Sequence, residues 1–158
     1  ACQAYLDQIH SHPERAREWH FLKACLHTVD HLQRLQVRLG ASREAQCWQS
    51  ARQLIDAGTT LDGGLRELRN LLHKKDWAGA AQLSSAMAER LNAEEIKQRE
   101  AIIADIAAGR EDTEAGDLLL AALVWMQWVG RHCWRVSHHL NDAATYSYIP
   151  TPTPRAPR

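Results

Sequence analysis

The sequence predicts an all-α protein: an antiparallel up-down bundle of four long helices, preceded by a short N-terminal helix. Three observations lead to this fold class. Several stretches repeat apolar residues at steps of three and four, which is the spacing of a helix that buries one side. One later stretch is apolar on every side, so it has to be enclosed by other helices. The corners between the stretches are short, which places consecutive helices antiparallel to one another.

The expected centre of the bundle is residues 117–140. In the first half of this stretch, 118–129, the only polar residue is Gln127. The apolar run is shorter than the roughly 20 residues that a membrane span requires, and Arg131 and Arg135 follow it directly. We therefore expect a buried core helix around which the other helices pack, and no insertion of this segment into a membrane.

Proline and glycine bound the first two helices. A short helix over residues 2–9 is expected to end before Pro13, and a long helix runs from Pro13, in its first turn, to Leu39 before Gly40. Apolar residues at steps of three and four give the long helix a narrow stripe, which we expect to face the core. The stripe is formed by Leu22, Cys25, Val29, Leu32 and Leu39.

The next helix is expected over residues 42–73, with Ser42 as its N-cap. Three glycines and two threonines between 58 and 64 lower its helix propensity by about 3 kcal/mol relative to alanine, so we expect a kink or a brief break there. Its apolar positions keep a helical spacing on both sides of the glycines. They are Ala45, Trp48, Ala51, Leu54, Ile55, Leu61, Leu65, Leu68 and Leu72.

Two further helices complete the bundle. One runs over 77–108, with Asp76 as its N-cap and Gly109 as its terminator, and the last begins after Asp112 or Thr113 and ends around 142–144. The charged segment 94–100 is interpreted as a solvent-exposed face. The apolar positions of the first of these helices are Leu83, Met87, Leu91, Ile96, Ile102, Ile103 and Ile106.

The C-terminal segment 146–158 is rich in proline, which excludes a helix and favours an extended tail. The sequence therefore predicts a helical bundle over 1–145 and a disordered tail over 146–158.

Composition narrows the function classes. Lys plus Arg equals Asp plus Glu, at 19 each, so no net positive charge supports binding to nucleic acid or to an anionic membrane surface. The four cysteines are widely spaced and form no CxxC pair, which is typical of reduced thiols in a cytosolic protein. The chain opens in an expected helix without a secretion leader, and we expect it to be part of a longer protein.

No catalytic motif is present. The sequence has no glycine-rich phosphate loop and no GxSxG or HExxH motif. Cys133 follows His132, but consecutive side chains on a helix point about 100° apart and do not form a dyad. We therefore expect no enzymatic activity.

The sequence also contains an internal echo. Residues 29–35 and 130–136 share a pattern in which a charged residue precedes a histidine and an arginine follows three positions after it. His31 and His132 are the two histidines of the echo, and Arg34 and Arg135 are its arginines. Two helices of the bundle thus carry the same local signature.

The segments Leu26–Leu35 (LHTVDHLQRL) and Trp125–Leu140 (WMQWVGRHCWRVSHHL) resemble the PhoU-like domain, in the version found as the cytoplasmic C-terminal region of bacterial sodium–phosphate cotransporters. In that family a helical bundle carries such an echo once in each half. Residues 5–32 look like the stretch by which those domains follow their membrane part. The resemblance covers nearly the whole chain outside the tail.

This resemblance implies a non-catalytic domain on the cytoplasmic side of the bacterial inner membrane, linked to phosphate uptake. Its implied partner is the transmembrane part of the same transporter chain. Two alternatives stay open: a free-standing PhoU-like regulator of phosphate uptake, and a metal-binding helical bundle that acts as a sensor or a store.

PhoU-like proteins can hold iron or zinc clusters through an acidic residue and an aspartate four positions later, on each of two helices. The corresponding pairs here are Leu26 with Asp30 and Gln127 with Arg131, so one carboxylate of four is present. Hard multinuclear sites need several oxygen ligands. We therefore expect no cluster of that type and no resident cofactor.

Histidine offers a separate argument for metal. His27 and His31 lie one helical turn apart, and such imidazole pairs can chelate zinc or nickel. The candidate metal ligands are His27, Asp30, His31 and His132, with His138 and His139 further along the last helix. The alternative is that these imidazoles form hydrogen bonds with Asp30 or water.

Tryptophan suggests self-association. Trp125, Trp128 and Trp134 lie on the last helix, and at 100° per residue Trp134 is about 180° from Trp125. They cannot all face one core, so we expect an apolar surface that a second copy of the chain covers in a homodimer. The alternative is that the rest of the transporter or its cytoplasmic loops cover this surface and the isolated domain is a monomer.

Overall fold

The fold consists of four long helices. In the computed structural model the described residues are 13–39, 47 and 51–147. The elements are α2 (Pro13–Leu39), a 3-10 turn η1 (Arg52–Leu54), α4 (Ile55–His73), α5 (Trp77–Ala107) and α6 (Thr113–Tyr146), and the described part of the chain contains no strand. The expected helix over 2–9, the cap at Ser42 and the tail beyond Ser147 lie outside the described residues.

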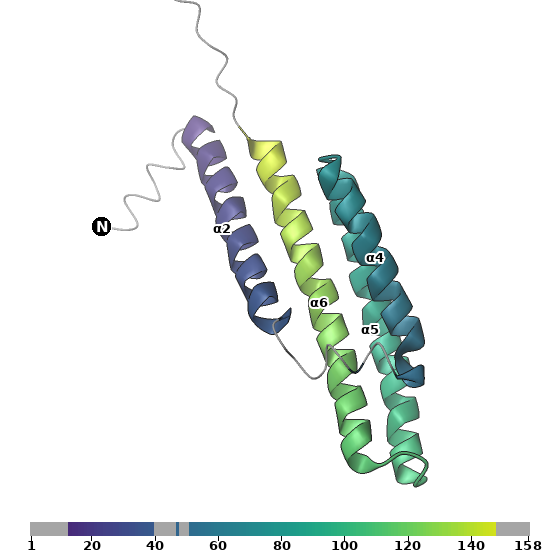
Figure 1. The fold of residues 1–158 in the computed structure, drawn as a ribbon. Coiled ribbons are helices and arrows are strands. Elements are labelled where there is room, and N and C mark those ends of the chain that lie inside the picture. The colour runs from purple at the N-terminus through teal and green to yellow at the C-terminus, as the bar shows by residue number, and fades with distance from the viewer. Residues whose placement is uncertain (1–12, 40–46, 48–50, 148–158) are drawn as a thin grey trace, which may run out of the picture.

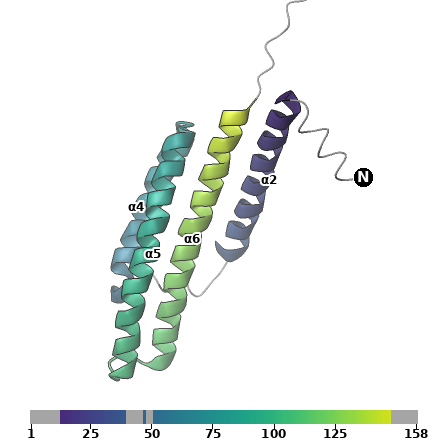
Figure 2. The same cartoon turned by 180° about the vertical axis from the view of Figure 1, so that it is seen from behind.

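Consecutive long helices run in opposite directions, which confirms the predicted all-α, up-down arrangement (Figure 1). The helices are not packed symmetrically. α6 packs extensively against α5 on one side and against α2 on the other, whereas α4 packs mainly on α5. Figure 2 shows α2 standing on the far side of α6 from α4 and α5. Among the described helices, α2 therefore has one extensive partner, α6.

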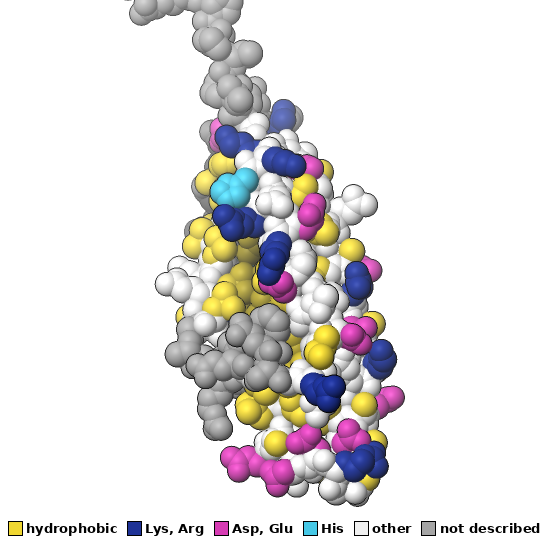
Figure 3. All heavy atoms as spheres, turned by 45° about the vertical axis from the view of Figure 1, so that its right-hand side comes forward, with side chains coloured by type: hydrophobic (Ala, Val, Ile, Leu, Met, Phe, Trp, Pro, Cys, Tyr) yellow, Lys and Arg dark blue, Asp and Glu magenta, His cyan; other side chains and the backbone are white. Residues whose placement is uncertain are grey.

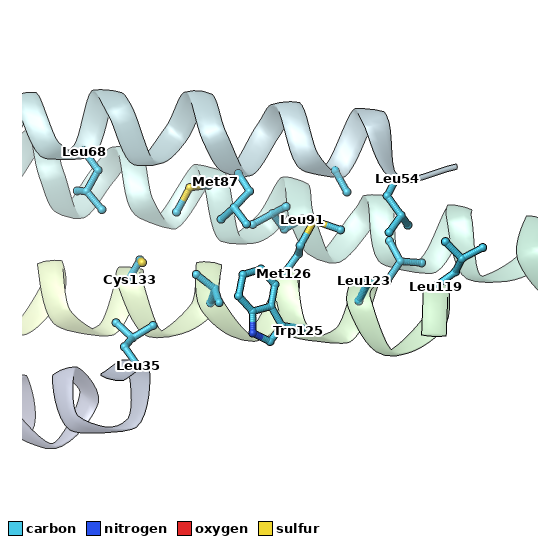
Figure 4. Close-up of a cluster of buried hydrophobic side chains, with 14 of the residues drawn as sticks. Leu35, Leu54, Leu68, Met87, Leu91, Leu119, Leu123, Trp125, Met126 and Cys133 are labelled. Atoms are coloured by element: carbon cyan, nitrogen blue, oxygen red, sulfur yellow. The ribbon is translucent and has the colours of Figure 1, made fainter. Parts of the chain in front are cut away.

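The all-apolar stretch of α6 lies at the centre, as the sequence predicts. Leu119, Leu123, Met126 and Val129 are buried, and they pack with side chains of α4 and α5 (Figure 4). On the other side of α6, Leu35 reaches across from α2 (Figure 4). None of the described helices combines the length and the apolarity that crossing a bilayer requires.

The predicted core stripe of α2 is wrong. The buried residues in the described part of α2 are Ala24, Thr28 and Leu35, and the first two have small side chains. Most of the predicted stripe is exposed instead, and it shares this exposure with further apolar residues; the exposed set is Trp19, Leu22, Leu26, Val29, Leu32, Val37 and Leu39. Leu26 and Thr28 are two residues apart, which is about 200° around a helix, so most of the exposed set lies opposite the buried residues, whereas Leu32 and Leu39 lie nearer to the buried side.

The predicted break near the glycines of α4 is also wrong. α4 is continuous from Ile55 to His73, and the chain departs from helical geometry earlier, at Ala51, whose φ of −86° and ψ of 118° are extended. A Cβ at Gly64 would overlap the side chain of Met87, so glycine permits the close approach of α5. This packing offsets the low helix propensity of glycine. Ile55, expected in the core, is exposed.

The predicted N-caps of α5 and α6 and the glycine that ends α5 are confirmed, whereas α6 runs to Tyr146, past its predicted end at 142–144. The Asp76 carboxylate accepts a hydrogen bond from the Gly79 N–H at 2.9 Å, and Gly109 follows α5 with a φ of +70°. The Asp112 carboxylate accepts from the Glu114 N–H at 2.9 Å at the start of α6. Both helices therefore have side-chain N-caps.

The charged segment of α5 is the expected solvated face only in part: Lys97 and Glu100 are exposed, but the segment also has a buried side. Glu95 and Gln98 are buried, because they lie at steps of three and four from Leu91 and Ile102 on the buried side of the helix. Glu95 accepts a hydrogen bond from Nε of Arg99 at 2.6 Å. The apolar Ile96 and Ile103 are correspondingly exposed.

Elsewhere the surface is mixed. Lys and Arg side chains alternate with Asp and Glu side chains over the face that carries α4, with hydrophobic side chains between them (Figure 3). Histidine barely appears in this view, which agrees with its concentration between α2 and α6 described below.

The central position of α6 predicts an unequal response to leucine truncation. Leu123→Ala should lower the free energy of unfolding by about 2–5 kcal/mol, because it leaves a cavity beside a side chain that is 1% exposed. Ile103→Ala is the control, since Ile103 is 50% exposed on α5, outside the α2 face, and should cost less than about 0.5 kcal/mol. Urea denaturation of both variants measures the difference, and equal shifts of the midpoint would show that α6 is not central.

Candidate functional site

The seam between α2 and α6 is rich in histidine. Of the seven histidines in the described part of the chain, five lie along this seam: His20, His27 and His31 on α2, and His132 and His139 on α6; the ring of His138 lies beside those of His139 and Trp134 on α6 itself. Small buried residues on both helices, such as Ala24, Thr28 and Ala143, contribute little side-chain volume. The rings therefore supply much of the contact between the two helices.

The imidazole rings interleave across the seam. His27 stacks on His139 with 4.9 Å between ring centroids, His139 lies parallel to His31 at 5.7 Å, and His31 meets His132 edge-on at 5.0 Å. The two helices are antiparallel, so residue numbers increase along α2 in the direction in which they decrease along α6. The result is a ladder of four rings, taken alternately from the two helices.

Further ring contacts lie at both ends of the ladder. His132 packs on Trp128 at 3.9 Å, and the Arg38 guanidinium lies over the Trp128 ring at 5.1 Å. At the opposite end His20 stacks on Tyr146 at 5.0 Å. The seam is thus lined by rings over most of the length of α2.

His31 and His132 form the closest contact in the ladder. Their Nδ1 atoms lie 3.1 Å apart, so one ring must donate a proton that the other accepts, and only rings that are not both protonated can do this. Burial against the facing helix lowers the pKa of both histidines. The Asp30 carboxylate opposes this shift, whereas Arg135 and Arg34 add to the shift at His31.

The echo in the sequence corresponds to this contact. His31 and His132 occupy equivalent places in the two repeated segments, 101 residues apart in the chain, and they face one another across two antiparallel helices. The echo thus marks one end of the four-ring ladder, where His31 meets His132.

A second cluster lies near the C-terminal end of α6. The Asp142 Oδ2 atom is 3.5 Å from Nε2 of His138 and 3.7 Å from Nδ1 of His139. Beside it is a cavity of about 270 Å³, lined by residues of both helices: His20, Lys23, Ala24, His27, His139, Asp142 and Tyr146. Burial lowers the pKa of His139. This end of the seam is therefore hollow and carries donors that suit a cation.

The structure brings only some of the predicted metal ligands together. His31 and His132 are in contact, whereas the ring of His139 separates His27 from His31. The carboxylate of Asp30 instead pairs with the Arg34 guanidinium at 2.9 Å. The Arg34 ion pair is the main cause that lowers the pKa of Asp30.

The four positions of the family-type metal cluster do not share a site. Gln127 and Arg131 line a groove of about 240 Å³ between α5 and α6, where Gln127 donates a hydrogen bond to the Asn92 side chain at 2.5 Å. Leu26 and Asp30 lie on α2, which packs on another side of α6.

The three tryptophans of α6 have different surroundings. Trp125 is 5% exposed, and its indole N–H donates to the backbone carbonyl of Arg38 at 3.3 Å, near the end of α2. Trp128 is half-buried under Arg38, and Trp134 is half-buried in the groove against α5 with Arg135 over its ring. A role of these residues in self-association stays a prediction.

Sequence reasoning missed Asp142 as a partner of His138 and His139. The signal was available, because an aspartate four residues after one histidine and three after the next lies on the same side of a helix as both. His20 and Tyr146 carried no such signal, since only the pairing of α2 with α6 brings their rings together.

Comparison of the chain with family models, with curated proteins and with solved structures found no match.

The lowered pKa values predict a seam that weakens in acid. A histidine whose pKa is lower in the folded protein than its ordinary value of 6.5 binds fewer protons there than in the unfolded chain, so its contribution to stability is complete above about pH 6.5 and is lost as the pH falls below that value. The thermal midpoint should therefore fall between about pH 7 and pH 5.

A double variant, His31→Gln with His132→Gln, should show a shallower fall over the same range, measured by circular dichroism with a chelator present. His73→Gln, on α4, is the control and should keep the slope of the wild type. Charged groups near the pair, Asp30 and Arg34 on α2 and Arg131 and Arg135 on α6, remain in every variant. An unchanged slope in the double variant would contradict the assignment.

Proposed function

We propose that this chain is a non-catalytic regulatory and interaction domain, of the kind that the PhoU-like resemblance implies: a cytoplasmic module of a bacterial sodium–phosphate cotransporter, linked to phosphate uptake. The observation that carries the interaction role is the apolar face of α2 that points away from α6. A free-standing PhoU-like regulator of phosphate uptake would use the same face.

The exposed face of α2 has the spacing of a helix-pairing seam. Trp19, Leu22, Leu26 and Val29 follow one another at steps of three and four, and Gln33 and Gln36 continue the series. This is the alternation by which one helix packs its side chains between those of another. Uncharged polar residues within such a seam fix the register of the pair.

The proposed occupant of this face is the α2 helix of a second copy of the chain. Among the described helices, α2 contacts only α6 extensively, and the apolar residues on its opposite side are exposed. A two-fold axis places the same seam on both sides of the interface, which makes the surface its own partner, and closed two-fold dimers are the commonest oligomers. In this proposal the transmembrane part of the transporter is tethered to the domain and does not occupy the α2 seam.

The residues that precede Ala1 in the full-length protein discriminate between the two settings. A series of apolar runs of about 20 residues each would favour the cotransporter, and their absence would favour the free-standing regulator.

Substitution of a charge into the seam should separate the copies. The wild-type chain should sediment at equilibrium as a species of twice 17.9 kDa, and Leu26→Glu should shift it to a single chain, because the dimer would bury a carboxylate without a partner. Ile103→Glu is the matched control: Ile103 is 50% exposed, but it lies on α5, so the dimer should persist.

A wild-type chain of 17.9 kDa at every concentration would overturn the dimer. So would a Leu26→Glu variant that dimerises as well as the control.

A further inference from the structure

We propose that the chain binds one divalent transition-metal ion, of the class of Zn²⁺, near the C-terminal end of α6, through His138, His139 and Asp142. This site is separate from the apolar face of α2 and does not depend on the dimer. It also differs from the family-type cluster positions, because none of its ligands belongs to them.

The separations between the donor atoms fit a single ion. Asp142 Oδ2 lies 3.5 Å from His138 Nε2 and 3.7 Å from His139 Nδ1, and the three donor atoms all lie within 4.8 Å of one another. A tetrahedral ion with ligands at about 2.0–2.2 Å separates its ligand atoms by about 3.4 Å. Two of the three separations are therefore already close to those of an occupied site.

Direct hydrogen bonds do not account for the cluster. An N–H···O hydrogen bond spans about 2.7–3.2 Å, and both histidine–carboxylate separations are longer. The carboxylate oxygen is near both rings without being hydrogen-bonded to either. A cation between the three groups would bring each of them to its preferred distance.

Helical spacing provides the chelate. His138 precedes Asp142 by four residues and His139 precedes it by three, so one ordered helix carries all three ligands. Val136, Ser137 and Ala143 are buried and hold this part of α6 in place. No loop has to become ordered when the ion binds, which reduces the entropic cost of the site.

The donor set selects the class of ion. Two imidazole nitrogens and one carboxylate oxygen suit Zn²⁺, Co²⁺ and Ni²⁺, whereas Ca²⁺ and Mg²⁺ prefer oxygen ligands throughout. Burial lowers the pKa of His139, which favours the neutral ring that a metal requires.

A fourth coordination position would face the cavity between α6 and α2. His139 and Asp142 line this cavity from α6, and Lys23, His20 and His27 line it from α2. A site with three protein ligands keeps one position for water or another small ligand. The ammonium group of Lys23 would favour an anion at that position over a second cation.

Calorimetric titration with Zn²⁺ tests the site. The full 158-residue chain, without an affinity tag and after treatment with a chelator, should bind one Zn²⁺ tightly. Both His138→Gln and Asp142→Asn should weaken this binding by more than about tenfold. Loss of a residue that only supports a metal ligand already weakens metal binding by about 10–100-fold, and these substitutions remove ligands themselves. His138 and Asp142 are 45% and 37% exposed at their side chains, so neither substitution empties the core.

His73→Gln and the His31→Gln, His132→Gln double variant are the matched controls, and both should bind Zn²⁺ as the wild type does. With Co²⁺ in place of Zn²⁺, the visible spectrum should show a tetrahedral ion in the wild type and lose it in Asp142→Asn. Absence of Zn²⁺ binding by the wild type would overturn the proposal. Binding that survives in His138→Gln and Asp142→Asn, or that is lost in the double variant, would place the ion elsewhere and overturn it equally. Leu26→Glu should bind Zn²⁺ normally, so a failure of the dimer leaves this result unaffected.

Discussion

α6 has to be covered on two opposite sides, and the arrangement of the other helices follows from this requirement. Its buried residues include Trp125 and Val136 toward α2 and Leu119, Leu123 and Met126 toward α4 and α5. α4 and α5 form one hairpin and lie on the same side of α6, so they cannot cover its opposite side. In the described structure, α2 is therefore the helix that covers the remaining side, and α6 is its one extensive helical partner.

This position explains the composition of the seam. α2 presents small side chains to α6, including Ala24 and Thr28, and histidine rings occupy the space between the helices. Rings that are neutral pack well, whereas protonated rings repel one another and require water. The same residues that close the seam therefore make it sensitive to proton concentration, whereas α5 carries no histidine.

The order of the long helices, the starts of α5 and α6 and the end of α5 could be predicted because capping residues and glycines act locally. Asp76 and Asp112 cap the helices that follow them, and Gly109 ends α5, as their positions in the sequence predict. The side of α2 that packs against α6 could not be predicted in this way. An apolar stripe at helical spacing indicates that one side of the helix will be buried, but it does not indicate which helix or chain will bury it. The expected stripe of α2 faces solvent in the described structure, and its small, polar side faces α6.

The candidate site was predictable to the extent that it depends on one helix. His27 and His31 were identified from their spacing along α2, and the echo identified His132 as the equivalent of His31. Pairs that form across the seam, such as His27 with His139, depend on the register of two helices that are distant in sequence. That register is set by the packing of the two helices, so it cannot be predicted from the periodicity of either helix.

Amide hydrogen exchange at two pH values tests most directly the claim that α2 is held by a proton-sensitive seam on α6. The account predicts that amides in the middle of α2 exchange through a local opening while those of Leu91 and Leu123 stay protected, and that this opening becomes more frequent below about pH 6.5 after correction for the intrinsic rate. Exchange of α2 and the α5–α6 core with the same free energy at both pH values would contradict it.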